Sequence, residues 1–453
     1  MPTSLEKVYK YIDDNADRFV DDLRKFCRQP SVSTRHEGID RCANLLKSLM
    51  EDAGIEANMF KVRDGHPVVL GLQRFVGTSK KLGFYNHYDV QPPEPLELWK
   101  SPPFSAEMRD GRIYARGVED NKGNLVARLK AVEAVREVLG KAPVDVKFLF
   151  EGEEEVGSPH LGTFVKGHID DLSADGFLWE GDGVDENDRP VVTLGVKGLM
   201  YVEMTATGAS SDVHSSKAPL VPNPAWRLVW ALNTLKDQDE RVRIADWDDD
   251  LVPPTEEEMK MISAMPFEGE NWKKRLELVE LLLSRSGTEA ARHLYYSPTC
   301  NICGIESGYT NEGIKTVLPS KAKAKVDFRL PYALSPNKLF PKLKNHLRRH
   351  GFGDIEVVNL AGYESCKTPV GDPFVQQTIR RLREIYLREP VVWPTIAGTS
   401  PMYVVKNWLG IPVVSCGGVG NPDSNAHAPN ENIRVADYIR SIKFVANMIA
   451  TFH

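Results

Sequence analysis

The chain has 453 residues, of which 42% are hydrophobic and 26% are charged, and its formal net charge at pH 7 is -6. This length exceeds the roughly 250–300 residues at which a single hydrophobic core stops growing, so we expect two domains or one domain interrupted by an insertion. The chain has no basic cluster of useful length, which argues against a nucleic acid partner. Six cysteines in so long a chain are typical of free thiols and do not indicate a disulfide framework.

The N-terminal segment, residues 1–26, carries apolar side chains at helical spacing together with acidic residues, which predicts an amphipathic helix. It lacks the charged-then-apolar layout of a secretory signal peptide. The chain also lacks the run of roughly 20 apolar residues that a membrane-spanning helix needs. We therefore expect a soluble, cytoplasmic protein with no membrane partner.

Short apolar, β-rich runs alternate with helical patterns over much of the chain. Strands are indicated at 67–72, 81–86, 144–150, 176–179 and 411–415. Helices are indicated at 124–139 and 374–387. This alternation predicts an α/β fold with a mostly parallel sheet and helices on both of its faces.

The middle of the chain has a different pattern, with long alternating strands at 199–208 and 314–330 and helices near 223–235 and 336–350. Such half-exposed strands are typical of a sheet covered on one face. We therefore expect a smaller α/β domain, 199–362, to be inserted into a discontinuous domain formed by 1–198 and 363–453. Residues 240–298, within the insertion, form an acidic and helical stretch of no predicted role.

The first chemical signal is His87-Tyr-Asp89, directly after the strand predicted at 81–86. Side chains two residues apart in extended chain point the same way, so Asp89 can hydrogen-bond a liganding imidazole and fix its tautomer. The second signal is Arg116-Gly-Val-Glu-Asp120-Asn-Lys-Gly, just before the helix predicted at 124–139. Taken alone, this second stretch is also typical of a turn and helix cap.

Acidic residues and a histidine follow three further strands. Glu154 and Glu155 lie in a carboxylate cluster after the strand at 144–150, Asp182 follows the strand at 176–179, and His427 follows the strand at 411–415. Ligands bind at the carboxyl ends of strands in open α/β sheets. Two adjacent carboxylates can divide labour there, one binding a metal and the other holding a proton of water.

Oxygen and imidazole ligands without a thiolate suit Zn²⁺, Mn²⁺ or Co²⁺ in a hydrolytic site. Cys300 and Cys303 have the spacing of a zinc knuckle, but no second pair completes such a site. The sequence lacks a G-x-S-x-G elbow, a P-loop and a G-x-G-x-x-G fingerprint, which argues against the chemistries that use them.

Four of these stretches together resemble the metallopeptidase family that includes carnosinase-type dipeptidases, carboxypeptidase G, aminoacylase, acetylornithine deacetylase and succinyl-diaminopimelate desuccinylase. They are HYD (87–89), RGVEDNKG (116–123), EGEEEVGS (151–158) and GNPDSNAHAPNE (420–431). The resemblance covers nearly the whole chain. It implies a two-metal exopeptidase core with an inserted lid domain through which two chains form a homodimer.

The resemblance also implies a set of metal ligands. His87 and Asp182 are expected to bind one divalent ion, Glu155 and His427 the other, and Asp120 is expected to bridge the two. Zinc is the ion that we expect, with manganese or cobalt as alternatives.

Other residues are expected to serve catalysis and substrate binding. Asp89 would orient His87, and Glu154 would be the general base and later the acid. His214 would be the lid histidine that reaches the active site of the partner protomer and supports the oxyanion. The resemblance further implies that Arg329 holds the carboxylate of the substrate and that a loop containing Ser400 touches the same end.

The chain departs from its relatives at Ser216, where glycine is common two residues after the lid histidine. The leading expectation for function is hydrolysis of dipeptides or short peptides next to a free carboxylate. An N-acyl amino acid deacylase or desuccinylase would share the metals and differ only in the pocket beyond the scissile bond. A non-catalytic, metal-stabilised binding protein is a third reading, which the presence of Glu154 and of every expected ligand disfavours.

Overall fold

The computed structural model describes residues 4–75, 77–265, 267 and 269–453. It divides the chain into two compact units. Unit 1 comprises Met1–Gly195, Thr368–Pro394 and Val404–His453, and unit 2 comprises Val196–Lys367 and Thr395–Tyr403. The divisions near 195 and 367 lie within a few residues of the boundaries expected from the sequence. The short segment Thr395–Tyr403 belongs to unit 2, although the sequence placed it in the discontinuous domain.

A central sheet organises unit 1, and within the described residues its eight strands follow the order β1-β2-β6-β3-β7-β18-β8-β17. The strands are β1 (Glu56–Phe60), β2 (Val68–Gln73), β3 (Lys80–His87), β6 (Val144–Glu151), β7 (Gly176–Trp179), β8 (Val191–Thr193), β17 (Val391–Trp393) and β18 (Val413–Cys416). The four central neighbours β6, β3, β7 and β18 run parallel to one another. Antiparallel pairing occurs toward the edges, at β1–β2, β2–β6 and β8–β18. The mostly parallel sheet predicted from the sequence is confirmed.

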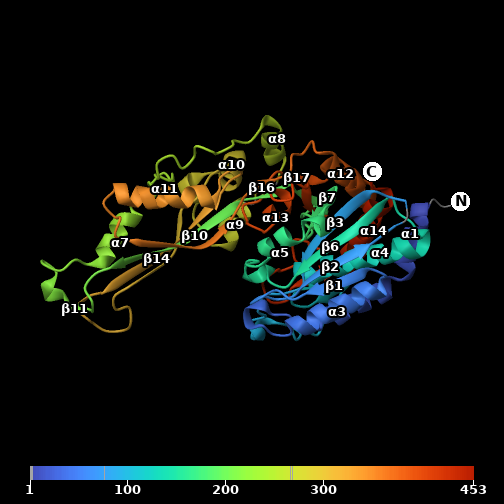
Figure 1. Cartoon of the computed structure of the whole chain (residues 1–453), viewed down its shortest axis with the longest axis horizontal. Coiled ribbons are helices and arrows are strands. Elements are labelled where there is room, and N and C mark those ends of the chain that lie inside the picture. Colours follow the sequence, from blue (N-terminus) through green and yellow to red (C-terminus); the bar gives the residue numbers. More distant parts are fainter. Residues whose placement is uncertain (1–3, 76, 266, 268) are drawn as a thin grey trace. The chain divides into compact units, whose positions relative to one another are not determined.

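Helices flank this sheet (Figure 1). They are α1 (Ser4–Asp14), α2 (Ala16–Cys27), α3 (Ile39–Asp52), α4 (Asn124–Leu139), α5 (Leu161–Gly167), α6 (Ile169–Leu172), α12 (Pro373–Tyr386), α13 (Tyr403–Lys406) and α14 (Val435–Thr451). The helix predicted at the N-terminus is two helices in the structure, because the helical hydrogen-bond pattern breaks between α1 and α2. Residues 1–3 of that prediction lie outside the described residues.

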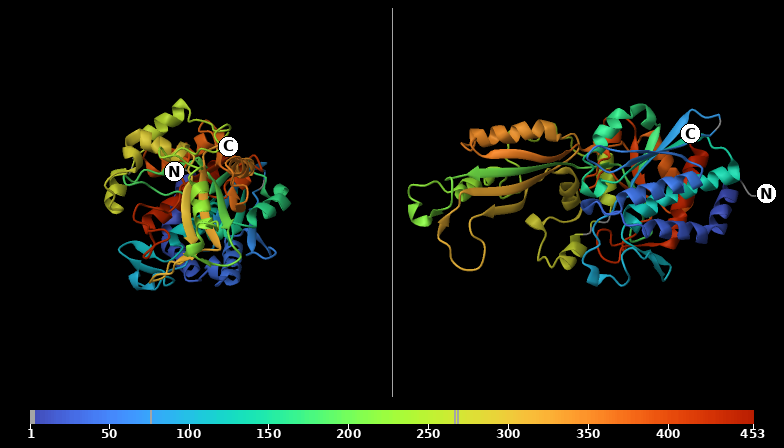
Figure 2. Two further views of the ribbon diagram at one scale, coloured as in Figure 1. Left: turned by 90° about the vertical axis from the view of Figure 1, so that its left-hand side faces the viewer. Right: turned by 60° about the horizontal axis from the view of Figure 1, so that its bottom comes forward.

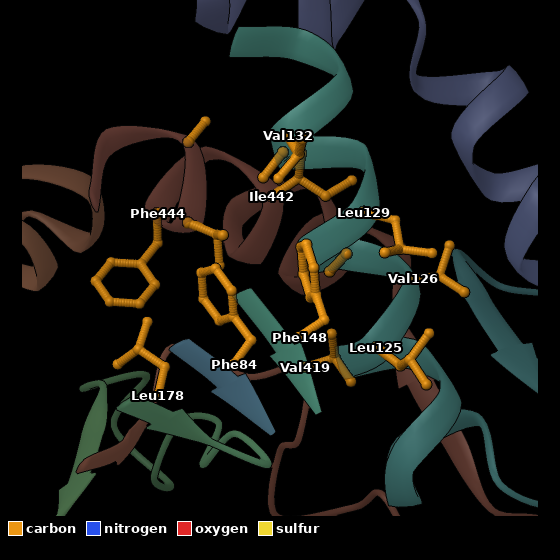
Figure 3. Packing of buried hydrophobic residues seen from close by; sticks show 14 of the residues in the cluster. Phe84, Leu125, Val126, Leu129, Val132, Phe148, Leu178, Val419, Ile442 and Phe444 are labelled. Atoms are coloured by element: carbon orange, nitrogen blue, oxygen red, sulfur yellow. The ribbon is translucent and has the colours of Figure 1, made fainter. Parts of the chain in front are cut away.

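The core of unit 1 lies between the sheet and the helices α4 and α14. In Figure 3, Leu129 of α4 and Ile442 of α14 lie above Phe84 of β3 and Phe148 of β6. Each such buried side chain stabilises the fold by about 1.5–3 kcal/mol relative to an exposed one. Elsewhere on the sheet, Phe164 of α5 packs edge-on against Phe60 of β1. This packing fixes the strands whose ends carry the candidate site.

Unit 2 is built on a sheet of β12 (Asn301–Ser307), β14 (Lys321–Leu330), β10 (Gly198–Thr207) and β15 (Glu356–Tyr363), in that order. The side chains of β10 alternate between buried and half-buried, as the sequence pattern predicts. The buried face packs against α7 (Pro224–Leu232) and α11 (Pro336–Arg349). Figure 2 shows α11, in orange, along one face of these strands.

The remaining elements of the chain are short. In unit 2 they are β9 (Gly195–Val196, at the boundary), β11 (Val213–His214), β13 (Val317–Leu318), β16 (Cys366–Lys367), α8 (Glu256–Ala264), α9 (Gly269–Arg275) and α10 (Gly287–Tyr296). In unit 1 a small sheet joins β4 (Glu107–Arg109), β5 (Arg112–Tyr114) and β19 (Asn432–Arg434). Short helical turns complete the chain as η1 (Ser33–Arg35), η2 (Leu96–Leu98), η3 (Val118–Gly123), η4 (Glu154–Val156), η5 (Ser215–Lys217) and η6 (Leu282–Ser284).

The elements of unit 2 agree only in part with those predicted from the sequence. The strand predicted over 314–330 was wrong in its extent, because β13 and β14 are separate strands. Strand β12 was not predicted. The helical stretch at 240–298 contains α8, α9 and α10, with residues 266 and 268 outside the described part.

Among the described residues, no helix combines the length and the hydropathy of a membrane span.

Candidate active site

The candidate site lies at the edge of the central sheet where the parallel strands end. His87 is the last residue of β3, Glu154 and Glu155 begin the turn η4 just after β6, and Asp182 follows β7. His427 lies in the loop between β18 and β19, with a left-handed backbone (φ 59°). Because β3, β6, β7 and β18 are parallel, their carboxyl ends meet at one edge.

Asp120 is the centre of this cluster. Its Oδ1 lies 2.9 Å from Nε2 of His87, and its Oδ2 lies 2.9 Å from Nε2 of His427. Nε2 of His427 is also 3.2 Å from Oε2 of Glu155. Each oxygen of Asp120 therefore faces a different imidazole, with Glu155 beside the second.

The contacts between imidazoles and carboxylates shift the pKa values of both partners. Hydrogen bonds that the imidazole of His427 donates to the carboxylates of Asp120 and Glu155 raise the pKa of His427 to about 10. Burial lowers the pKa of His87, but Asp120 and Asp89 outweigh burial and raise it well above its usual range. For Asp120 the effects are reversed: burial alone would raise its pKa, but the two histidines outweigh burial and lower that pKa. Each imidazole and the carboxylate of Asp120 thus favour the charged form of the other.

Asp89 connects the two halves of the cluster. Its Oδ1 lies 3.4 Å from Nδ1 of His87. Its two carboxylate oxygens accept hydrogen bonds from the backbone N–H groups of Glu154 and Glu155, at 3.2 and 3.1 Å. Asp89 therefore fixes the turn that presents the two glutamates while it faces the imidazole of His87.

The two glutamates have different surroundings. Oε2 of Glu155 accepts a hydrogen bond from Nε2 of Gln91 at 2.8 Å and faces His427. Glu154 is half-buried, and the burial of its carboxyl raises the pKa of that group to about 8, an effect that the nearby charge of His87 opposes. A carboxyl that holds a proton near neutral pH is suited to general acid–base work.

The turn that carries Asp120 is held by Glu431, a residue to which the sequence assigned no role. Its Oε1 accepts hydrogen bonds from the backbone N–H groups of Glu119 and Asp120, and its Oε2 accepts from the N–H of Gly117 and from Nη1 of Arg116. Arg116 and Glu431 are each 1% exposed. Glu431 closes the motif 420–431, so its position beside His427 was a signal for a role in the site.

The end of β7 carries a second residue that the sequence did not single out, Glu180. Burial and then the charge of Glu154 raise its pKa well above the usual range, while the charge of His87 lowers it. The carboxyl of Asp182 has other neighbours: burial raises its pKa to about 6, and the hydroxyls of Thr193 and Ser415 oppose the shift. The charges of Glu154, His87 and Asp120 thus act on Glu180, and Asp182 in turn raises the pKa of Glu180 and of Glu119.

The donor set fits divalent cations. Among the described residues, the one group of three or more possible ligands within 4.8 Å of one another is His87, Asp120 and Glu155. Oε1 of Glu155, Oε1 of Glu180 and Oδ2 of Asp182 are buried without a hydrogen-bond partner. A buried carboxylate oxygen without a partner is costly unless a cation completes its coordination. Oxygen and imidazole donors are the ligands of Zn²⁺, Mn²⁺ and Co²⁺ in hydrolytic sites.

His214 lies in unit 2, where β11 pairs with β13. Its Nδ1 accepts a hydrogen bond from the backbone N–H of Ser216 at 3.1 Å and lies 2.9 Å from the Ser216 hydroxyl. Because Nδ1 is an acceptor, the proton of the neutral ring is on Nε2. Nε2 lies 3.4 Å from Oγ1 of Thr316. Ser216 is the residue at which the sequence departs from the family pattern. It holds the imidazole of His214 with Nε2–H available as a donor.

Arg329 and the loop containing Ser400 also meet in unit 2. Nη1 of Arg329 donates to the hydroxyl of Thr399, the neighbour of Ser400, at 2.9 Å. Nε of Arg329 lies 3.5 Å from Oδ2 of Asp327, and 37% of the Arg329 side chain is exposed. The guanidinium therefore has room for a further anionic partner. Of the two cysteines with knuckle spacing, Cys300 is buried and Cys303 is exposed.

Comparison with known proteins gives one matching family. The model of peptidase family M20/M25/M40 matches residues 83–451. Human Beta-Ala-His dipeptidase is 28% identical over 473 residues, which cover 98% of this chain and 92% of the human protein. Cys-Gly metallodipeptidase of Saccharomyces cerevisiae is 26% identical over 98% of both chains.

Solved structures agree with this assignment. The M20 family metallo-carboxypeptidase Sso-CP2 of Sulfolobus solfataricus has a TM-score of 0.89 and 43% identity, covering 94% of this chain and 97% of its own. Human carnosine dipeptidase 1 has a TM-score of 0.77 and 26% identity, covering 98% of this chain and 99% of its own. The resemblance seen in the sequence motifs is confirmed: the chain belongs to peptidase family M20/M25/M40 and is a metal-dependent peptidase.

Proposed function

We propose that the protein hydrolyses the peptide bond of dipeptides or short peptides that bear a free C-terminal carboxylate, in a site that holds two divalent cations. The observation that carries this proposal is the cluster in which Asp120 faces one imidazole with each oxygen, beside the buried carboxyl of Glu154. Two relatives named for dipeptide hydrolysis cover 98% of the chain, which supports the substrate class.

We assign the ligands as follows. Asp120 would contact both cations, His87 would hold one, and Glu155 with His427 would hold the other. For the fifth ligand the sequence favours Asp182, and we propose Glu180 in its place because the charges of Glu154, His87 and Asp120 act on its carboxyl, whereas Thr193 and Ser415 are the neighbours that act on Asp182. Zinc is the proposed ion, and manganese or cobalt would suit the same donors.

The residues of the chain divide the reaction among them. When bound, a pair of such cations lowers the pKa of a shared water and polarises the scissile carbonyl. Glu154 accepts the proton of the attacking water and returns it to the departing amine. Nε2–H of His214 donates to the oxygen on which negative charge develops. Arg329 pairs with the carboxylate of the substrate, next to the loop of Thr399 and Ser400.

We further propose that the protein is a homodimer that pairs through unit 2. Strand β12 is an edge strand with almost all of its side chains exposed, including Ile302 (46%) and Ile305 (56%). Trp226 and Trp230 of α7 are 58% and 55% exposed. An uncovered strand edge and exposed tryptophans are both features that proteins normally cover. A second copy of the chain can cover both, with a two-fold axis relating identical surfaces.

A substrate panel tests the activity. The metal-free protein is reloaded with Zn²⁺, Mn²⁺ or Co²⁺ and assayed with dipeptides, their C-terminal amides and N-acetyl and N-succinyl amino acids. We expect release of amino acids from dipeptides, with much weaker turnover of the amides. Release of acetate or succinate at higher kcat/KM than any dipeptide would assign the protein to the deacylases instead.

A further inference from the structure

Lys197 is a buried cation that has no acidic partner in the described part of the chain. It follows β9, and its side chain is 1% exposed. Its ammonium donates to the carbonyl oxygens of Leu294 and Ser297, at 2.6 and 2.7 Å. Among the described residues, the only charge that shifts its pKa is that of Arg329, which acts with burial to lower the pKa to about 7. A buried lysine next to another cation is unusual, because buried charges are normally paired with opposite ones.

The contacts of Lys197 reach both segments that hold Arg329. Leu294 and Ser297 lie at the end of α10, and Thr299, two residues further on, exchanges two hydrogen bonds with Arg329. On the other side, the backbone N–H of Lys197 donates to the carbonyl of Gly398 at 3.0 Å. Gly398 precedes Thr399, whose hydroxyl accepts from Arg329. Lys197 thus connects the end of the 240–298 stretch to the loop of Ser400 around one guanidinium.

The charges around Arg329 do not balance. Lys197 and Arg329 supply two positive charges when both are protonated, and Asp327 supplies one negative charge, 3.5 Å from Nε of Arg329. The exposed part of the guanidinium leaves room for an anion, and an anion bound there would neutralise the excess. A perturbed buried lysine beside a candidate binding residue is itself a sign of a functional site.

We propose that Lys197 is a specificity-determining residue of the Arg329 subsite, where it supplies a second positive charge and fixes the segment 297–299 that positions Arg329. This inference rests on the proposed function and extends it. Lys197 acts through electrostatics and through the segments that it ties together, so it selects substrates that end in a carboxylate. The 240–298 stretch then has a role, because the end of α10 supplies the carbonyl groups that hold the ammonium.

The test compares a dipeptide with its C-terminal amide in the metal-loaded enzyme. For Lys197→Met, which retains the length of the side chain without its charge, we expect the KM of the dipeptide to rise at least about tenfold while kcat changes less than about threefold. The KM of the amide should stay within about twofold, so the preference for the carboxylate falls. Lys197→Arg should keep most of the preference. The control is Lys323→Met, an exposed lysine of β14 paired with Glu203, which should leave both constants unchanged.

Two outcomes separate this inference from the proposed function. A wild-type enzyme that hydrolyses none of the dipeptides contradicts both. An active wild type whose carboxylate preference survives Lys197→Met contradicts the role of Lys197 alone, as do equal losses on dipeptide and amide.

The wild type provides a second test that does not depend on the folding of a variant. A lysine with a lowered pKa is positive below that pKa and neutral above it. The preference for the dipeptide is measured as the KM of the amide divided by the KM of the dipeptide. This ratio should therefore be high at pH 6 and fall as the pH rises through about 7. The charge that acts on Lys197 is that of Arg329 of β14, and α10 and the 398 loop contribute carbonyl groups. A ratio that is constant from pH 6 to 9 would overturn the proposal.

Discussion

Glu154 and Glu155 are consecutive residues whose backbone N–H groups both donate to Asp89, yet their carboxyls have different surroundings. Glu155 faces the imidazole of His427 and keeps one buried oxygen without a partner, as a metal ligand would. Glu154 is surrounded by the charges of His87 and Asp120. This difference supports the division of labour that two adjacent carboxylates allow, one for the metal and one for the proton.

The first prediction follows from this division. Glu154→Gln should retain both metals and lower kcat by about 10²–10⁴-fold, because the glutamine cannot accept the proton of the attacking water. Metal content by elemental analysis and kcat at saturating dipeptide check it. If Glu154→Gln lost a metal while Glu155→Gln kept both, the two roles would be exchanged.

The second prediction distinguishes the two acidic residues that follow β7. If Glu180 is the fifth ligand, Glu180→Gln should lower the affinity for one of the two metals at least about tenfold, and Asp182→Asn should have a much smaller effect. Isothermal titration of each metal-free variant with Zn²⁺ measures this directly. A loss confined to Asp182→Asn would restore the assignment made from the sequence.

This pair shows where prediction from the sequence reached its limit. The sequence correctly located an acidic residue just past a buried strand, because strand ends are visible as apolar runs. It could not say which of Glu180 and Asp182 faces the cluster, because strand alternation ends at Trp179 and the backbone turns irregularly. Glu180 has φ 30° and Gly181 has φ 137°, and neither value can be read from residue types.

At the scale of elements, the turn η3 that carries Asp120 is held from outside by a loop more than 300 residues later in the chain. Glu431 supplies four acceptor contacts to this turn and to Arg116, and the whole group is buried. The antiparallel pairing of β19 with β5 brings Glu431 there. The proposed metal ligands Asp120 and His427 are therefore positioned by the same small sheet.

The third prediction concerns this buried pair. Glu431→Gln should destabilise the protein by about 3 kcal/mol or more, because the change leaves the Arg116 guanidinium buried without its counter-charge. It should also lower the affinity for metal, because the backbone N–H groups of Glu119 and Asp120 would no longer donate to a carboxylate. The control, Glu51→Gln, removes an exposed pair with Lys47 and should cost less than about 1 kcal/mol. Unfolding followed by circular dichroism compares the two, and equal effects would contradict the role given to Glu431.

Elements with a strong pattern could be predicted, and elements without one could not. Helix α4 and strand β7 have the predicted bounds, because apolar residues fill the buried positions of β7 and most of those of α4, where Arg128, Lys130 and Glu133 are also buried. Strand β12 was missed because almost every side chain on it is exposed, so the sequence shows no alternation of apolar and polar residues. Its pairing partner β14 specifies the strand through backbone hydrogen bonds, which leave little trace in residue types.

For the whole molecule, the proposed dimer gives the fourth prediction. If each site needs Glu154 from one chain and His214 from its partner, Glu154→Ala and His214→Ala homodimers should both be nearly inactive. Random re-pairing of the two should recover roughly a quarter of the wild-type sites, because about half the dimers are mixed and each has one intact site of two. Mixing the variants and measuring dipeptide hydrolysis tests this. If tagged subunits exchange and activity stays absent, His214 serves its own chain or has only a structural role.

The central claim is that dipeptide hydrolysis requires two divalent cations held by the cluster around Asp120. Stepwise titration of the metal-free protein with Zn²⁺, with bound metal and hydrolysis measured on the same samples, tests it most directly. We predict that binding ends at two ions per chain, that chelated protein is inactive, and that full activity returns only as the second ion binds. Full activity at one ion per chain, or in the chelated protein, would contradict the claim.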